Sequence, residues 1–274
     1  MSDHSEALSR IADALERLAP PAAAPTDWLS APAYVWHGSA RAVGVLAAPA
    51  LALLKGIDAQ KEAVVGNVAR LASGFAAHDM LLWGSRGMGK SALLRAAVLA
   101  AQNDGADRIA LVQVAPEALS SLAQLFNELA AQPRSFLVFI DDLGFEDNDS
   151  SGPRALRSWL EGGIEARPGN VRIAVTSNRR AIVPRHLSEQ DDPINPRDAV
   201  DDRLALADRF GLSIGFHNCS QDDYLAIIGG YCEEFGLAWS EGEALEWSKR
   251  RGSRSGRVAW QFVTELAGRA GKSL

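Results

Sequence analysis

The sequence contains few cysteines and no long apolar run, and each shortage excludes a class of protein. The only cysteines, Cys219 and Cys232, are too far apart for a C-x-x-C motif and have no histidines at metal-ligand spacing. We therefore expect buried free thiols in a reducing compartment. No apolar run approaches the roughly 20 residues that span a bilayer, and the N-terminus lacks the basic-then-apolar pattern of a secretory signal. These shortages predict a soluble, cytoplasmic protein without membrane contact.

Basic charge is also in short supply. The net charge of the 274 residues is −6, which argues against a surface coated for nucleic acid, although a local basic patch remains compatible with it. The densest basic cluster comprises Lys249, Arg250, Arg251, Arg254 and Arg257. The sequence has no recognisable helix-turn-helix, zinc finger or aromatic stacking platform. We therefore expect a protein partner rather than DNA.

One segment matches the phosphate-loop pattern G-x-x-x-x-G-K-[ST] at every fixed position. An apolar run, Met80–Trp83, precedes it and predicts a buried strand, and Ser91–Gln102 after it predicts a helix. A glycine-rich turn between a strand and a helix N-terminus favours anion binding, because backbone N–H groups and the helix dipole point at the ligand. Lys90 would reach the β- and γ-phosphates, and the Ser91 hydroxyl would ligate Mg²⁺. The pattern runs through Gly84, Ser85, Arg86, Gly87, Met88, Gly89, Lys90 and Ser91.

Two further apolar runs end in polar residues that fit the same site. Phe136–Ile140 predicts a strand buried on both faces, and Asp141 and Asp142 follow it directly. Ligands of parallel sheets bind at the carboxyl ends of the strands, so acids at this strand end should face the nucleotide. The segment is a Walker B pattern. In it, Asp141 would hold Mg²⁺ through water, and Asp142 would orient or deprotonate the attacking water. Asn178 follows another predicted strand, 171–176, and can bond a γ-phosphate or that water.

The rest of the chain predicts an α/β domain between two helical parts. Leu8, Ile11, Leu15 and Leu18 form an amphipathic helix that either packs on its own domain or docks a partner. We place domain limits at 1–25 for this helix and its linker, 26–218 for a nucleotide-binding core and 219–274 for a helical lid. Further strands are expected at 108–114 and 211–217, and helices at 60–75, 204–210, 222–235, 241–250 and 257–270, with an apolar helical face at Leu119, Leu122, Phe126 and Leu129.

The ordered set of motifs resembles the AAA+ ATPases over about residues 50–270. The segments LLWGSRGMGKS, FIDDLGFE, VTSNRR, ADRFGL and RSGRVAWQF are similar to a bacterial AAA+ family known as a domain of unknown function, number 815. More distantly, the Asp141-Asp142 pair resembles the replication initiator and helicase-loader branch. The resemblance implies a P-loop NTPase fold with a parallel five-stranded sheet flanked by helices and a small all-α lid, with ATP and Mg²⁺ as cofactors.

The resemblance also implies roles for individual residues. Gly56 and Ile57 would border the adenine, and Asn178 would be the first sensor. Arg209 would be an arginine finger that acts in trans on a neighbouring subunit, which implies a homo-oligomer; Arg203 is an alternative. Arg257 would be the second sensor, at the start of a lid helix.

One departure leaves two functions open. Asp142 is shorter by a methylene than the usual glutamate, so turnover could be slow unless Glu146 compensates. The chain is then either an ATP-hydrolysing AAA+ protein that remodels or loads a partner, or a weakly hydrolysing switch that recruits a protein or DNA. A small-molecule kinase fits poorly, because it explains neither Asn178 nor the helical tail.

Overall fold

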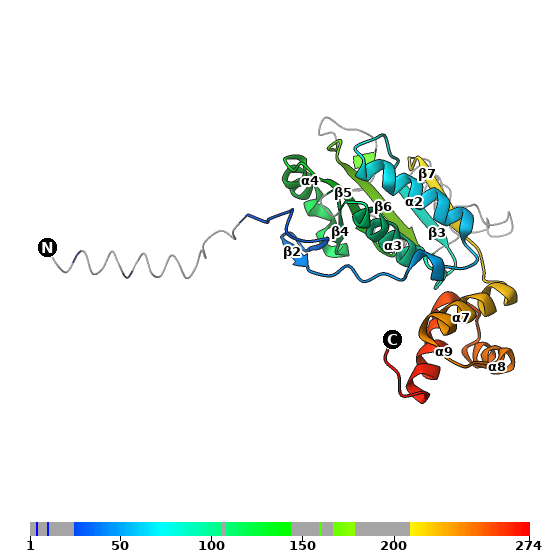
Figure 1. Ribbon diagram of the computed structural model, residues 1–274. Helices are drawn as coiled ribbons and strands as arrows, with labels where there is room; N and C mark the ends of the chain where they lie inside the picture. The colour runs from blue at the N-terminus through cyan, green and yellow to red at the C-terminus, as the bar shows by residue number, and fades with distance from the viewer. Residues whose placement is uncertain are drawn as a thin grey trace, which may run out of the picture.

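The computed structural model describes residues 4, 10, 25–105, 108–143, 159–160, 167–178 and 209–274. Within these ranges the fold is α/β: helices cover a mostly parallel β-sheet, and three further helices follow at the C-terminus (Figure 1). The predicted N-terminal amphipathic helix and most of the predicted helix 204–210 lie outside the described residues, as do Glu146 and Arg203.

The five predicted strands are present and run parallel to one another. They are β3 (Met80–Gly84), β4 (Ile109–Val114), β5 (Ser135–Ile140), β6 (Val171–Ser177) and β7 (Leu212–Phe216). Their spatial order is β4-β5-β6-β3-β7. Their carboxyl ends therefore lie along one edge of the sheet, which we call the carboxyl edge.

The expected count of five strands is wrong, because the sheet formed by the described residues already has seven. β1 (Ala33–Trp36) adds to β4 in parallel, and β2 (Ala40–Val43) folds back on β1 in antiparallel register. Each of the two strands has four residues, which is too short for an alternating pattern to stand out from the alanine-rich segment around it. They extend the sheet at the side away from the phosphate loop.

Both faces of the sheet are covered by helices. α2 (Asp58–Ala72) and α3 (Lys90–Asn103) cover one face, and η2 (Pro116–Ser121) with α4 (Leu122–Ala130) covers the other. Alternate residues of a strand join opposite clusters: Met80 and Leu82 belong to the cluster with α2 and α3, whereas Leu81 belongs to the cluster with α4. This double burial explains why the strands are continuous apolar runs.

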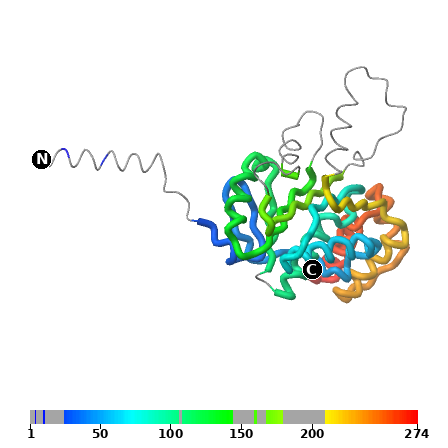
Figure 2. The backbone as a smooth tube through the Cα atoms, turned by 90° about the horizontal axis from the view of Figure 1, so that it is seen from above, coloured from blue at the N-terminus to red at the C-terminus, as the bar shows by residue number. Residues whose placement is uncertain are grey.

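The C-terminal helices are α7 (Gln221–Phe235), α8 (Glu241–Arg251) and α9 (Gly256–Arg269). Serine side chains cap all three N-termini, and the chain leaves α7 and α8 through left-handed glycines. The Tyr224 hydroxyl donates to the Ala244 carbonyl at 3.2 Å and ties α7 to α8. In both overall views these helices lie on the opposite side of the sheet from β1 and β2 (Figure 2).

The prediction of buried free thiols is confirmed for both cysteines. Cys219 and Cys232 are buried and unpaired. Burial raises the pKa of the Cys219 thiol to about 11, with the Asp223 carboxylate adding to the effect. Among the helices of the described ranges, none combines the length and the hydropathy that a membrane span requires.

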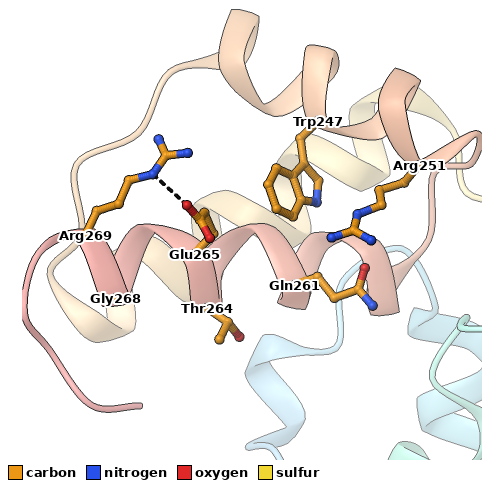
Figure 3. A pocket seen from close by; sticks show the side chains of 7 residues that line it. All are labelled: Trp247, Arg251, Gln261, Thr264, Glu265, Gly268 and Arg269. Atoms are coloured by element: carbon orange, nitrogen blue, oxygen red, sulfur yellow. Dashed lines mark hydrogen bonds and ion pairs between the residues drawn. The ribbon is translucent and has the colours of Figure 1, made fainter.

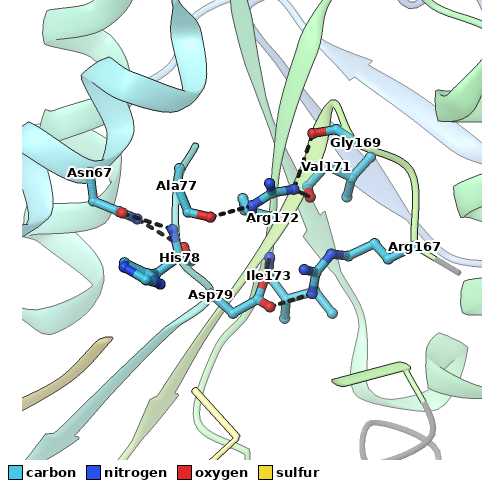
Figure 4. Close-up of polar contacts among 9 residues, drawn as sticks. All are labelled: Asn67, Ala77, His78, Asp79, Arg167, Gly169, Val171, Arg172 and Ile173. Atoms are coloured by element: carbon cyan, nitrogen blue, oxygen red, sulfur yellow. Dashed lines mark hydrogen bonds and ion pairs between the residues drawn. The ribbon is translucent and has the colours of Figure 1, made fainter. Parts of the chain in front are cut away.

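A buried ionic cluster joins the strands at the edge opposite to the carboxyl edge (Figure 4). The Asp79 carboxylate accepts hydrogen bonds from Arg167 and, at 2.7 Å, from the backbone N–H of Ile173. Asp79 immediately precedes β3, and Ile173 lies in β6. The side chain of Asp79 is only 9% exposed, so solvent cannot replace these bonds.

We predict that Asp79→Ala destabilises the protein strongly, because it leaves the largely buried Arg167 guanidinium without its carboxylate and the Ile173 N–H without its acceptor. The free energy of unfolding should fall by about 3 kcal/mol. Urea denaturation followed by circular dichroism measures the change. Asp104→Ala, at an exposed helix end, is the matched control and should unfold like the wild type. Equal stability of the two variants would contradict the prediction.

Candidate nucleotide-binding site

The phosphate loop lies at the carboxyl edge, between the end of β3 and the start of α3. Gly84 has a φ of +119°, and a Cβ there would lie 2.1 Å from the Phe216 carbonyl oxygen, so only glycine fits beside β7. Gly89 has a φ of +89° and is the N-cap of α3. The loop therefore presents the first-turn N–H groups of α3, which have no intrahelical acceptors, to the space above it.

Lys90 is the buried cation of the site, with only 6% of its surface exposed. Its ammonium donates to the carbonyls of Gly84 at 2.9 Å and Ser85 at 2.8 Å and to the side-chain oxygen of Asn178 at 3.1 Å. Burial lowers the pKa of Lys90, and the carboxylates of Asp142 and Asp141 oppose the shift. The structure thus brings Lys90 and Asn178, 88 residues apart in sequence, into contact.

Ser91 and Asp141 form the oxygen-rich side of the site. The Ser91 hydroxyl donates to Asp141 Oδ1 at 2.7 Å, and the Thr176 hydroxyl donates to the same oxygen at 2.6 Å. No group of three or more His, Cys, Asp or Glu side chains converges on a metal position in the described ranges. Mg²⁺ needs no such group, since it keeps several waters and takes one or two protein oxygens together with substrate phosphates. The donor set of Ser91 and Asp141 fits that preference.

Asp142 is held in an unusual backbone conformation beside Asn178. Its φ of 51° makes it the only non-glycine residue with a positive φ in the described part of the chain. Its backbone N–H donates to Thr176 Oγ1 at 2.8 Å, and its carboxylate accepts a short hydrogen bond from the Asn178 amide. Asp adopts the left-handed region more readily than most residues do. The backbone conformation at this position therefore favours an aspartate over the usual glutamate.

The expected adenine segment lies against the phosphate loop and α7. A Cβ on Gly89 would lie 3.7 Å from the Ile57 side chain, so the buried Ile57 packs beside the loop. A Cβ on Gly56 would lie 2.8 Å from an oxygen of Asp223, in the first turn of α7. Gly56 and Ile57 thus lie where the loop meets the C-terminal helices.

The start of α9 also contacts the loop. The backbone N–H of Arg257 donates to the Gly87 carbonyl at 3.1 Å, and a Cβ on Gly87 would lie 2.9 Å from the Ser255 hydroxyl oxygen. The Arg257 side chain is exposed. The predicted second sensor therefore begins a helix that is hydrogen-bonded to the phosphate loop.

Not every predicted site residue belongs to this cluster. Arg209 is half-buried and lies before β7, at the edge of the sheet opposite to the phosphate loop. Arg86 is an exposed loop residue, whereas Met88 is buried in the core. Ser85 does belong to it, because its carbonyl accepts from Lys90, and its hydroxyl also donates to the side-chain oxygen of Asn218.

Sequence reasoning missed three residues that contact the site. Thr176 bonds Asp141, Asn218 bonds Ser85, and Asp223 lies against Gly56. Thr176 could have been found as the polar residue at the buried end of β6, two positions before Asn178. Asn218 and Asp223 give no local signal of a site, because polar residues before a helix and acidic residues in its first turn are typical of any helix N-terminus.

Known proteins share this fold. The RuvB Holliday junction branch migration motor of Thermotoga maritima superposes with a TM-score of 0.54 at 15% identity, covering 83% of this chain and 68% of RuvB. The ORC1 protein of Aeropyrum pernix, solved in complex with DNA, gives a TM-score of 0.54 at 16% identity and covers 79% and 61% of the two chains. At these identities the likeness shows the fold alone.

The family comparison covers most of the sequence. Residues 29–270 match the family described as protein of unknown function DUF815, which confirms the resemblance found in the motifs. A comparison with curated proteins finds no match. The chain therefore belongs to the DUF815 family, and it carries a phosphate loop in a fold that it shares with RuvB and ORC1.

Proposed function

We propose that this protein binds ATP at the carboxyl edge and hydrolyses it, and that it couples its nucleotide state to the remodelling or loading of a macromolecular partner. The observation that carries the proposal is the contact of Lys90 with Asn178 beside that of Ser91 with Asp141. These contacts assemble phosphate-binding, metal-binding and water-orienting groups from three separate strand ends.

The proposed roles follow from the chemistry of each group. Lys90 and the loop N–H groups hold the phosphates, and Mg²⁺, when bound, offsets phosphate charge beside Ser91 and, through water, Asp141. Asp142 accepts a proton from the attacking water or orients it. Asn178, which already bonds both Lys90 and Asp142, positions the γ-phosphate or that water.

Arg209 is proposed to act on a neighbouring subunit. β7 runs parallel to β3, and Arg209 lies three residues before β7, whereas the phosphate loop follows the other end of β3. At about 3.3 Å per residue along a strand, Arg209 and the phosphate loop are roughly 20 Å apart. This distance is too great for Arg209 to contact a nucleotide bound in its own subunit. A role at the γ-phosphate therefore requires a second copy, and a homo-oligomer follows from it.

The C-terminal helices are proposed to form a lid that begins near residue 219. Arg257 would extend from the start of α9 toward the phosphates, and Gly56 and Ile57 would border the adenine. A protein partner remains the better proposal than DNA, because the chain is acidic overall.

We predict that steady-state ATPase activity per subunit rises with protein concentration. Arg209→Ala should abolish the increase with concentration, because Arg209 completes the site of a neighbouring subunit. Lys90→Ala should abolish all activity, because Lys90 binds phosphate. Lys249→Ala is the control, since this lysine is exposed at the end of α8 and should leave the rate unchanged. Activity that is independent of concentration and survives Arg209→Ala would refute the trans-acting role.

A second candidate function is a nucleotide-gated switch. The observation that favours it is Asp142, which is short, has a left-handed backbone and is already bonded to Asn178. A carboxylate held in this way is poorly placed to activate water unless the bound nucleotide displaces the bond. Such a protein would bind ATP tightly and recruit a partner without appreciable turnover.

Asp142→Asn separates the two functions, because it preserves size and backbone preference while removing the base. In a hydrolysing enzyme, the rate constant of the hydrolysis step should fall by about a hundredfold while ATP affinity stays near the wild-type value. Single-turnover hydrolysis measures both quantities, and Glu146→Gln in the same assay tests whether that residue compensates. A wild-type rate as low as that of Asp142→Asn would favour the switch.

A further inference from the structure

A pocket of about 520 Å³ lies between α8 and α9, away from the nucleotide site (Figure 3). α8 lines it with Trp247 and Arg251, and α9 with Gln261, Thr264, Glu265 and Arg269. No predicted nucleotide-site residue is among them. The ligand of this pocket must therefore be inferred from the side chains that line it.

The pocket wall contains a hydrogen-bond donor that lacks an acceptor. The indole nitrogen of Trp247 is buried and makes no hydrogen bond to any described residue. The Trp247 ring packs against Phe262 at a centroid distance of 5.9 Å, which fixes its orientation. Buried donors are nearly always satisfied, so this one would bond an acceptor from outside once an exposed neighbouring side chain, such as that of Arg251, moves to admit it.

Positive charge lies beside this donor. The Arg251 guanidinium lies 4.9 Å from the centre of the Trp247 ring, and within the described ranges no carboxylate pairs with it. Figure 3 shows the indole nitrogen and the polar ends of Arg251 and Gln261 gathered at one end of the pocket. Arg269, at the other end, is already paired with Glu265 and Glu243. One end of the pocket therefore offers several donors and a positive charge that no described carboxylate neutralises.

We propose that this pocket docks an acidic segment of a protein partner. A carboxylate of that segment accepts hydrogen bonds from Arg251 and Trp247, and an adjacent apolar side chain packs on the indole ring. A nucleic acid fits less well, because Glu265 and Glu243 would face its continuous phosphate backbone, whereas a single carboxylate meets only the donor end. Docking of an acidic partner segment would serve the remodelling or loading role, so this inference rests on the proposed function.

α9 connects this pocket to the nucleotide site. The helix starts at the hydrogen bond between Arg257 and Gly87 in the phosphate loop, and it carries most of the residues that line the pocket. A change in the loop on nucleotide binding would move α9 against α8. Nucleotide state and partner affinity are then coupled through one helix.

The test uses the ¹⁵N-labelled full-length protein and an octapeptide of alternating glutamate and leucine. The indole N–H signal of Trp247 is identified as the one missing in Trp247→Phe. On titration without nucleotide this signal should move downfield and saturate, while those of the other tryptophans stay in place. A Trp247 signal that does not move would overturn the proposal.

Two adjacent arginines provide matched variants. Arg251→Gln should weaken peptide binding about tenfold, because it removes a charged donor. Arg250 is already paired with Glu246, so Arg250→Gln should change peptide binding by less than about twofold. Equal effects of the two variants, or stronger movement of the signal by a thymidine oligonucleotide, would also overturn the proposal. A protein that binds this peptide but not ATP would contradict the proposed function alone, and the reverse result would contradict only the pocket.

Discussion

Three parallel strands, β3, β5 and β6, end at the same edge of the sheet, and the polar groups at their ends satisfy one another. The Lys90 ammonium is solvated by two loop carbonyls and Asn178, and Asp141 accepts from Ser91 and Thr176. A buried ammonium without such acceptors would be strongly unfavourable. The register of the strands and the geometry of the site therefore depend on each other.

The C-terminal helices are attached to the same loop at several points. Gly87 accepts from Arg257, and Gly56 lies against Asp223 of α7. Ser85 bonds Asn218, in the segment between β7 and α7. Packed elements change between discrete arrangements, so a displacement of the loop is expected to shift the helices as a unit. This arrangement explains how a ligand at the sheet edge could be sensed at the surface of α8 and α9.

Much of the fold could be predicted because its signals are local. The phosphate loop and the double-buried strand before Asp141 are short patterns with a direct physical meaning, and the five parallel strands follow from their apolar runs. The strands β1 and β2 could not, because four residues carry too little periodicity. The contacts of Asn218 and the pocket around Trp247 depend on tertiary packing between separate elements, which no local pattern records.

The proposed chemistry depends on the binding of ATP with Mg²⁺ at the carboxyl edge through Lys90 and Ser91. Calorimetric titration of ATP, in Mg²⁺ and in EDTA, measures this binding. Mg²⁺ should tighten binding to the wild type, Ser91→Ala should lose this enhancement while still binding ATP in EDTA, and Lys90→Ala should show no measurable binding. Equal affinity of Lys90→Ala and the wild type for ATP with Mg²⁺ would refute this binding site.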